Sequence, residues 1–114
     1  MSDFNIKVRE EGNVTILETS GYLNNFGGEQ VASICKQRIS EGKRKLLINM
    51  ENTKMVNSIG VSILIEVIED LQGVNGTIGY YNVVPIVEKT FNIMGITNYS
   101  KIYTSEEEAL QALA

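Results

Sequence analysis

The sequence contains no histidine and no tryptophan, and it has a single cysteine, Cys35, and a single proline. The absence of histidine excludes Ser-His-Asp and Cys-His nucleophile systems, and it also excludes histidine-based zinc sites. One cysteine cannot form a disulfide within the chain. The remaining routes to catalysis use Lys, carboxylate or Tyr side chains, so we expect a protein that is not an enzyme and has no catalytic residue, metal or cofactor.

Long apolar runs and positive charge are also scarce. No stretch approaches the ~18 apolar residues of a membrane span, and the charged start MSDFNIKVREEG is unlike a signal peptide. We therefore expect a cytoplasmic protein without a membrane span. The chain has 10 basic and 14 acidic residues, a net charge of −4, and its only basic run is Lys43-Arg44-Lys45. This small basic surface disfavours nucleic-acid binding.

What is present is the composition of one globular domain. The chain has 114 residues, of which 43% are hydrophobic, so we expect residues 1–114 to form a single domain with a packed core. Residues 4–9 and 14–18 alternate between apolar and polar on either side of Glu11-Gly12-Asn13, which predicts an antiparallel hairpin. Ser20-Gly21 interrupts this pattern.

Periodicity and turn residues predict the elements that follow. Apolar residues at helical spacing predict helices over about 27–41, ending at a left-handed Gly42, and over 58–72. The other expected elements are a buried strand at 46–50, a polar loop at 51–54, a strand at 77–83, a helix from Pro85 to Gly95, a short strand at 102–103, and a last helix with a capping box at Ser105 and Glu108. The order is β-β-α-β-α-β-α-β-α. It predicts an α/β fold with a mostly parallel mixed central sheet, an N-terminal β-hairpin strand and about four helices.

Three features that resemble ligand sites have structural interpretations. The glycine-rich segment 73–79 follows a helix and enters a strand, the reverse of a phosphate-binding loop, and we interpret it as a turn. Three successive acids, Glu106 to Glu108, point in different directions and stabilise a helix start. Cys35 lies on the apolar face of the first helix, and we interpret it as a small buried hydrophobe.

Ser58 opens the most apolar helix of the chain, and two interpretations of it remain open. In one, the hydroxyl caps the helix. In the other, Ser58 accepts a phosphoryl group, which would add a charge of about −1.5 to −2 at a surface edge. Ile59, Ile63 and Val67 form an apolar stripe that starts beside Ser58. This stripe is either a partner interface or is covered by the third helix or the sheet.

Three short stretches in this order carry a family resemblance: Gly21-Tyr22-Leu23-Asn24, Leu47-Ile48-Asn49-Met50 and Asn57-Ser58-Ile59-Gly60-Val61. Together with the later segment NVVPIVEKTFNIMGI, they resemble the STAS domain family, and the bacterial anti-sigma factor antagonists in particular. The resemblance covers nearly the whole chain. Where that family often carries Asp, this sequence has Asn24, Asn49 and Asn57, so a negative charge beside the serine is lost.

The resemblance implies a partner-switching protein. Such an antagonist binds an anti-sigma factor that is also a serine kinase, is inactivated when the kinase phosphorylates it with ATP, and is restored by a phosphatase. Ser58 matches the phosphoacceptor, and the implied partner surface comprises Asn24, Asn57, Ser58, Ile59, Gly60 and Ile63. We expect a monomer or weak dimer. The alternative is a constitutive STAS interaction module, a scaffold subunit or the partner of a lipid-transport ATPase, that phosphorylation does not regulate.

Overall fold

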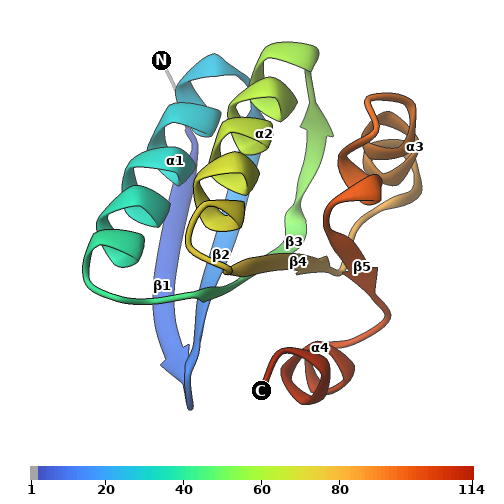
Figure 1. The fold of residues 1–114 in the computed structure, drawn as a ribbon. Helices are drawn as coiled ribbons and strands as arrows, with labels where there is room; N and C mark the ends of the chain where they lie inside the picture. Colours follow the sequence, from blue (N-terminus) through green and yellow to red (C-terminus); the bar gives the residue numbers. More distant parts are fainter. Residues whose placement is uncertain (1–2) are drawn as a thin grey trace.

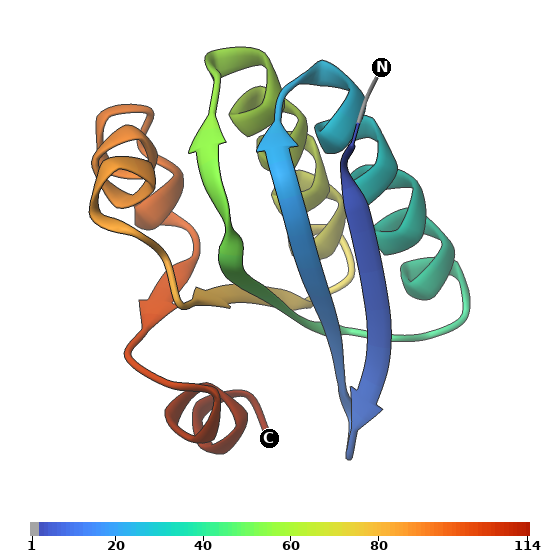
Figure 2. The same cartoon turned by 180° about the vertical axis from the view of Figure 1, so that it is seen from behind.

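The computed structural model describes residues 3–114, which form a five-stranded sheet with helices on both faces (Figures 1 and 2). The elements are β1 (Asn5–Glu11), β2 (Val14–Leu23), α1 (Asn25–Ser40), β3 (Lys45–Val56), α2 (Ser58–Gln72), β4 (Thr77–Tyr81), α3 (Pro85–Ile93), a 3-10 helix η1 (Ile96–Asn98), β5 (Lys101–Tyr103) and α4 (Glu106–Leu113). The strands lie in the order β1-β2-β3-β4-β5, with β1 antiparallel to β2 and all other neighbours parallel. The predicted fold class is confirmed.

The two faces of the sheet bury two separate apolar cores. Helices α1 and α2 lie side by side over one face, where Leu17 and Ile48 belong to the larger core. Side chains alternate between faces along a strand, so the neighbouring residues Ile16 and Leu47 point to the other face. There they form a smaller core with Ala109 and other residues of α4.

Two predicted boundaries in the central strands are wrong, for one physical reason. Residues 51–54 belong to β3 and do not form a loop, and Ser20-Gly21 lies within β2. The two strands support each other in this region: Thr53 is fully buried, and its hydroxyl lies 2.7 Å from that of Thr19. Register shifts between Glu18 and Tyr22, with Gly21 at φ +115°, let the polar stretch stay paired.

Other differences are at the ends of elements. Helix α1 begins two residues earlier than expected, and β4 ends at Tyr81, where Asn82 takes a positive φ of 57°. Gly42 has the predicted left-handed conformation, with φ +95°. Cys35 is fully buried as expected, and burial raises the pKa of its thiol to about 12, so the thiolate that would react is disfavoured.

The ends of β2 and β3 place two helix starts at one edge of the sheet. Leu23 and Val56, the last residues of these strands, are direct partners, and α1 and α2 follow almost at once. Both helices therefore begin at the same end of the molecule, at the top of Figure 1. Within residues 3–114, no helix combines the length and the apolar character that crossing a membrane would require.

Candidate functional site

Ser58 is the first residue of α2, and its side chain is exposed. The residue that caps the helix is Asn57, whose Oδ1 accepts a hydrogen bond from the backbone N–H of Gly60 at 2.8 Å. The interpretation of Ser58 itself as the cap is therefore wrong. Within the described part of the chain, the Ser58 hydroxyl makes no hydrogen bond, so this oxygen is presented to solvent.

The start of α1 repeats this arrangement next to it. The side chain of Asn24 caps α1 by accepting from the backbone N–H of Gly27 at 3.0 Å. The two caps are tied together, because the backbone N–H of Asn57 donates to the carbonyl of Leu23 at 3.2 Å. An amide oxygen serves as a cap as well as a carboxylate oxygen does. Asn24 and Asn57 therefore keep both helix starts intact without adding charge.

Gly60 sets how closely α2 approaches the end of β2. A Cβ at this position would lie 2.2 Å from the carbonyl oxygen of Leu23, far inside van der Waals contact. A Cβ at Gly28 of α1 would in turn lie 3.3 Å from the Cα of Gly60. Gly60 is buried, so it shapes the edge and presents no side chain to a partner.

The apolar stripe of α2 is covered along most of its length, in part by α1. Val67 is fully buried in the same core as Val31 of α1. Ile63 is partly buried against Gly28, where an added Cβ would meet its Cδ1 at 3.1 Å. Only Ile59 is free, with 56% of its surface exposed. The expected alternative was cover by the third helix or the sheet; for Ile63 the covering element is α1, and Val67 lies in a core that the sheet also lines.

Three further exposed apolar residues lie at the same ends of β2 and β3 and in the first turn of α1, and the sequence interpretation missed them. Tyr22, Phe26 and Met55 are 40%, 59% and 59% exposed. Tyr22 and Met55 are direct partners at the ends of β2 and β3, and Phe26 lies in the first turn of α1. The sequence did contain a signal for them. Tyr22 and Phe26 flank Asn24, Met55 precedes Asn57, and none of the three belongs to a periodic pattern. We call this surface the Ser58 edge, and it comprises Tyr22, Asn24, Phe26, Met55, Asn57, Ser58 and Ile59.

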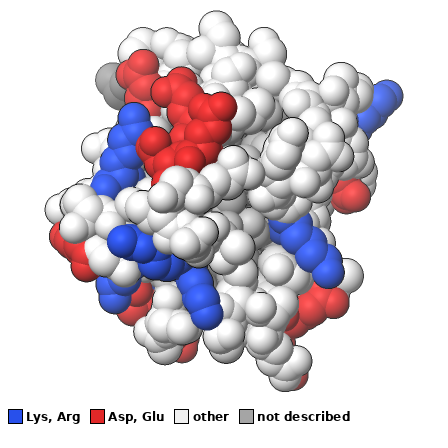
Figure 3. All heavy atoms as spheres, viewed as in Figure 1, with Lys and Arg blue, Asp and Glu red and all other residues white. Residues whose placement is uncertain are grey.

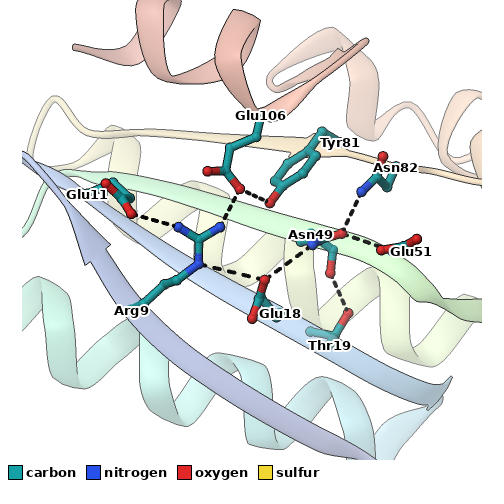
Figure 4. Close-up of polar contacts among 9 residues, drawn as sticks. All are labelled: Arg9, Glu11, Glu18, Thr19, Asn49, Glu51, Tyr81, Asn82 and Glu106. Atoms are coloured by element: carbon teal, nitrogen blue, oxygen red, sulfur yellow. Dashed lines mark hydrogen bonds and ion pairs between the residues drawn. The ribbon is translucent and has the colours of Figure 1, made fainter.

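Asn49 lies on the other face of the sheet and is not part of the Ser58 edge. Its Nδ2 lies 3.4 Å from a carboxylate oxygen of Glu18, and its Oδ1 accepts from Asn82 Nδ2 at 3.1 Å (Figure 4). The backbone N–H of Glu51 donates to the same Oδ1 at 3.1 Å. These contacts border a groove of about 490 Å³ across β1, β2 and β3.

Glu106, in the acidic run, anchors α4 to this face. Its carboxylate accepts from the hydroxyl of Tyr81 at 2.6 Å and pairs with the guanidinium of Arg9 (Figure 4). The hydrogen bond from Tyr81, followed by that from Arg9, lowers the pKa of Glu106. The predicted capping box is present in shifted form: Ser105 Oγ accepts from the backbone N–H of Glu108, whose carboxylate accepts from the backbone N–H of Thr104 at 2.8 Å.

Comparison with known proteins finds a matching family model and a relative of similar length. The family model described as STAS domain matches residues 5–109. BtrV of Bordetella bronchiseptica, whose name proposes an anti-sigma factor antagonist, is 23% identical over 92 residues, which are 81% of this chain and 79% of that protein.

Among solved structures, an anti-sigma factor antagonist from Mycobacterium paratuberculosis has a TM-score of 0.85 at 18% identity, covering 97% of this chain and 94% of its own. The anti-sigma factor antagonist SpoIIAA of Bacillus has a TM-score of 0.73 unphosphorylated, at 21% identity over 96% of both chains. Its phosphorylated form scores 0.72 at 22% identity, covering 97% of this chain and 99% of its own. These structural matches establish the shared fold.

Proposed function

This chain belongs to the STAS domain family, and from that membership we propose that it is an anti-sigma factor antagonist that phosphorylation of Ser58 inactivates. The observation that carries the proposal is the exposed, unbonded hydroxyl of Ser58 at the start of α2, at an end of the molecule where apolar side chains remain 40–59% exposed. The names of BtrV and SpoIIAA both describe an anti-sigma factor antagonist, and this supports the same role for the chain.

The Ser58 edge suits a contact that one charge can break. While Ser58 carries a hydroxyl, a partner can cover Phe26, Met55 and Ile59 and gain free energy from burying their apolar surface. A partner kinase transfers the γ-phosphoryl group of ATP to Ser58 Oγ, releasing ADP and the hydroxyl proton. The added charge, about −1.5 to −2, is strongly disfavoured in a contact that offers it no counter-charge.

The same position lets the chain itself tolerate the phosphate. Ser58 lies at the N-terminus of a 15-residue helix, where free backbone N–H groups and the helix dipole stabilise an anion. We therefore expect no refolding on phosphorylation. The likeness of this chain to both forms of SpoIIAA, at TM-scores of 0.73 and 0.72, supports the view that the fold accommodates phosphorylation in that relative.

The test is phosphorylation by the anti-sigma factor kinase encoded in the same genome. Incubation with the kinase and ATP should add one phosphoryl group by intact mass, and a phosphatase should remove it. Ser58→Ala should abolish the addition. Ser62→Ala, which changes an exposed serine one helical turn further on, is the matched control and should be modified like the wild type. Unchanged modification of Ser58→Ala would refute the assignment.

The same experiment separates the alternative role. A stable complex that ignores ATP and every substitution of Ser58 would identify a constitutive STAS interaction module. Asn57 favours this alternative, because it leaves the position before the serine uncharged.

A further inference from the structure

The two segments that build the Ser58 edge contain no charged residue. Residues 19–28 read TSGYLNNFGG, and residues 55–65 read MVNSIGVSILI. Charged residues make up 21% of the chain, so 21 positions of average composition would carry about four. Figure 3 shows the result: the top of the molecule, where β3 leads into α2 in Figure 1, shows neither acidic nor basic atoms, while acidic side chains gather below it, over the region of α1 and α2.

The charges nearest in sequence lie around the edge and not within it. Glu29 borders a hollow on α1 that Phe26 also lines. Lys54 directly precedes Met55, and Asp3 lies near Gly21, with its backbone oxygen 3.3 Å from the position of an added Cβ there. The two caps at the centre of the edge are amides. The unmodified edge is therefore neutral, with four large exposed apolar side chains, Tyr22, Phe26, Met55 and Ile59.

We infer that the partner covers the apolar side chains of the Ser58 edge with an apolar, uncharged surface and forms no ion pair with this edge before Ser58 is phosphorylated. The inference rests on the proposed function and specifies its partner. A basic side chain of the partner placed against Asn24, Asn57 and Ser58 would find no carboxylate and would be buried unpaired, which is strongly unfavourable. A neutral contact has no such penalty, and its affinity depends little on salt.

Asn57→Asp tests this inference without disturbing the fold. Asp caps a helix as well as Asn does, and the two side chains have the same shape, so α2 should start as before. The substitution places a carboxylate directly beside Ser58. Against a partner without a matching cation, we expect the dissociation constant of the complex with the anti-sigma factor to rise at least about tenfold. The wild-type value should change less than about twofold between low and high salt.

Asn13→Asp is the matched control. Asn13 lies in the turn between β1 and β2, at the opposite end of β2 from the Ser58 edge, and is exposed. The substitution makes the same change of charge away from the contact, so the variant should bind the partner like the wild type. Melting temperatures of both variants show whether the fold is intact.

The outcomes separate this inference from the proposed function. Equal or tighter binding by Asn57→Asp, or a wild-type affinity that falls steeply with salt, would show that the partner presents basic residues and would overturn the inference alone. Absence of any complex, together with absence of phosphate on Ser58, would overturn the proposed function, and the neutral contact would fall with it.

Discussion

At the scale of single residues, Gly60 determines whether the Ser58 edge can form. Its missing side chain allows α2 to start against the carbonyl of Leu23, where a Cβ would lie at 2.2 Å. The three atoms nearest to that Cβ all belong to the backbone of Leu23 and Asn24, so no flexible side chain could move aside. The exposed hydroxyl of Ser58, two residues earlier, is therefore held in place by a close contact that only glycine permits.

Gly60→Ala should destabilise the protein for this reason. We expect a loss of about 1–3 kcal/mol in the free energy of unfolding, measured by urea denaturation, and weaker binding of the partner because α2 must shift. Gly73→Ala is the control, since an added Cβ there finds its nearest neighbour at 3.4 Å and φ is −63°. That variant should be as stable as the wild type or slightly more so. Equal stability of both variants would contradict the geometry.

At the scale of elements, α4 depends on Glu106 for its polar attachment. Helix α4 packs on the sheet through Ala109 and Leu113, and Glu106 adds the contacts with Tyr81 and Arg9. Because the pKa of Glu106 is lowered in the folded state, its ionised form stabilises the fold. That contribution is fully present above the unfolded pKa and disappears as the pH falls through the lowered folded value.

Glu106→Gln should therefore lower the free energy of unfolding near neutral pH by about 1 kcal/mol, a modest value because Glu106 and Arg9 are partly exposed to water. The difference from the wild type should vanish in acid, below the lowered pKa, when both side chains are uncharged. Glu107→Gln, which removes a neighbouring exposed carboxylate, should have a smaller effect. A pH-independent difference for Glu106→Gln would show that the charge is not what holds α4.

The elements also show which parts of the fold could be predicted from the sequence. Periodicity and capping residues predicted the order of strands and helices, because each pattern is local. The polar residues 51–54 could not be recognised as strand, since their pairing comes from β2, and Thr53 is buried only through tertiary contact. The motif pointed to Asn57 and Ser58, whereas the exposure of Tyr22 and Met55 follows from two strand ends meeting.

At the scale of the whole molecule, the two cores share their strands. Ile16 and Leu17 are neighbours in β2 but belong to different cores, as do Leu47 and Ile48 in β3. Neither core can lose its strands without disrupting the other. We therefore expect residues 3–114 to unfold in one cooperative transition, as a single domain does. Thermal unfolding followed by far-ultraviolet and near-ultraviolet circular dichroism should give one midpoint, and two midpoints would contradict this view.

The whole molecule is acidic, with a net charge of −4, yet it presents a neutral edge where Ser58 lies. In the proposed switch, a single covalent change on that edge alters recognition without altering the fold. The most direct measurement is the dissociation constant of the complex with the anti-sigma factor, determined for the unmodified protein and for the protein phosphorylated at Ser58. We predict that phosphorylation raises it at least about a hundredfold, as expected for an unpaired charge in the contact. Equal affinities of the two forms would contradict the proposed switch.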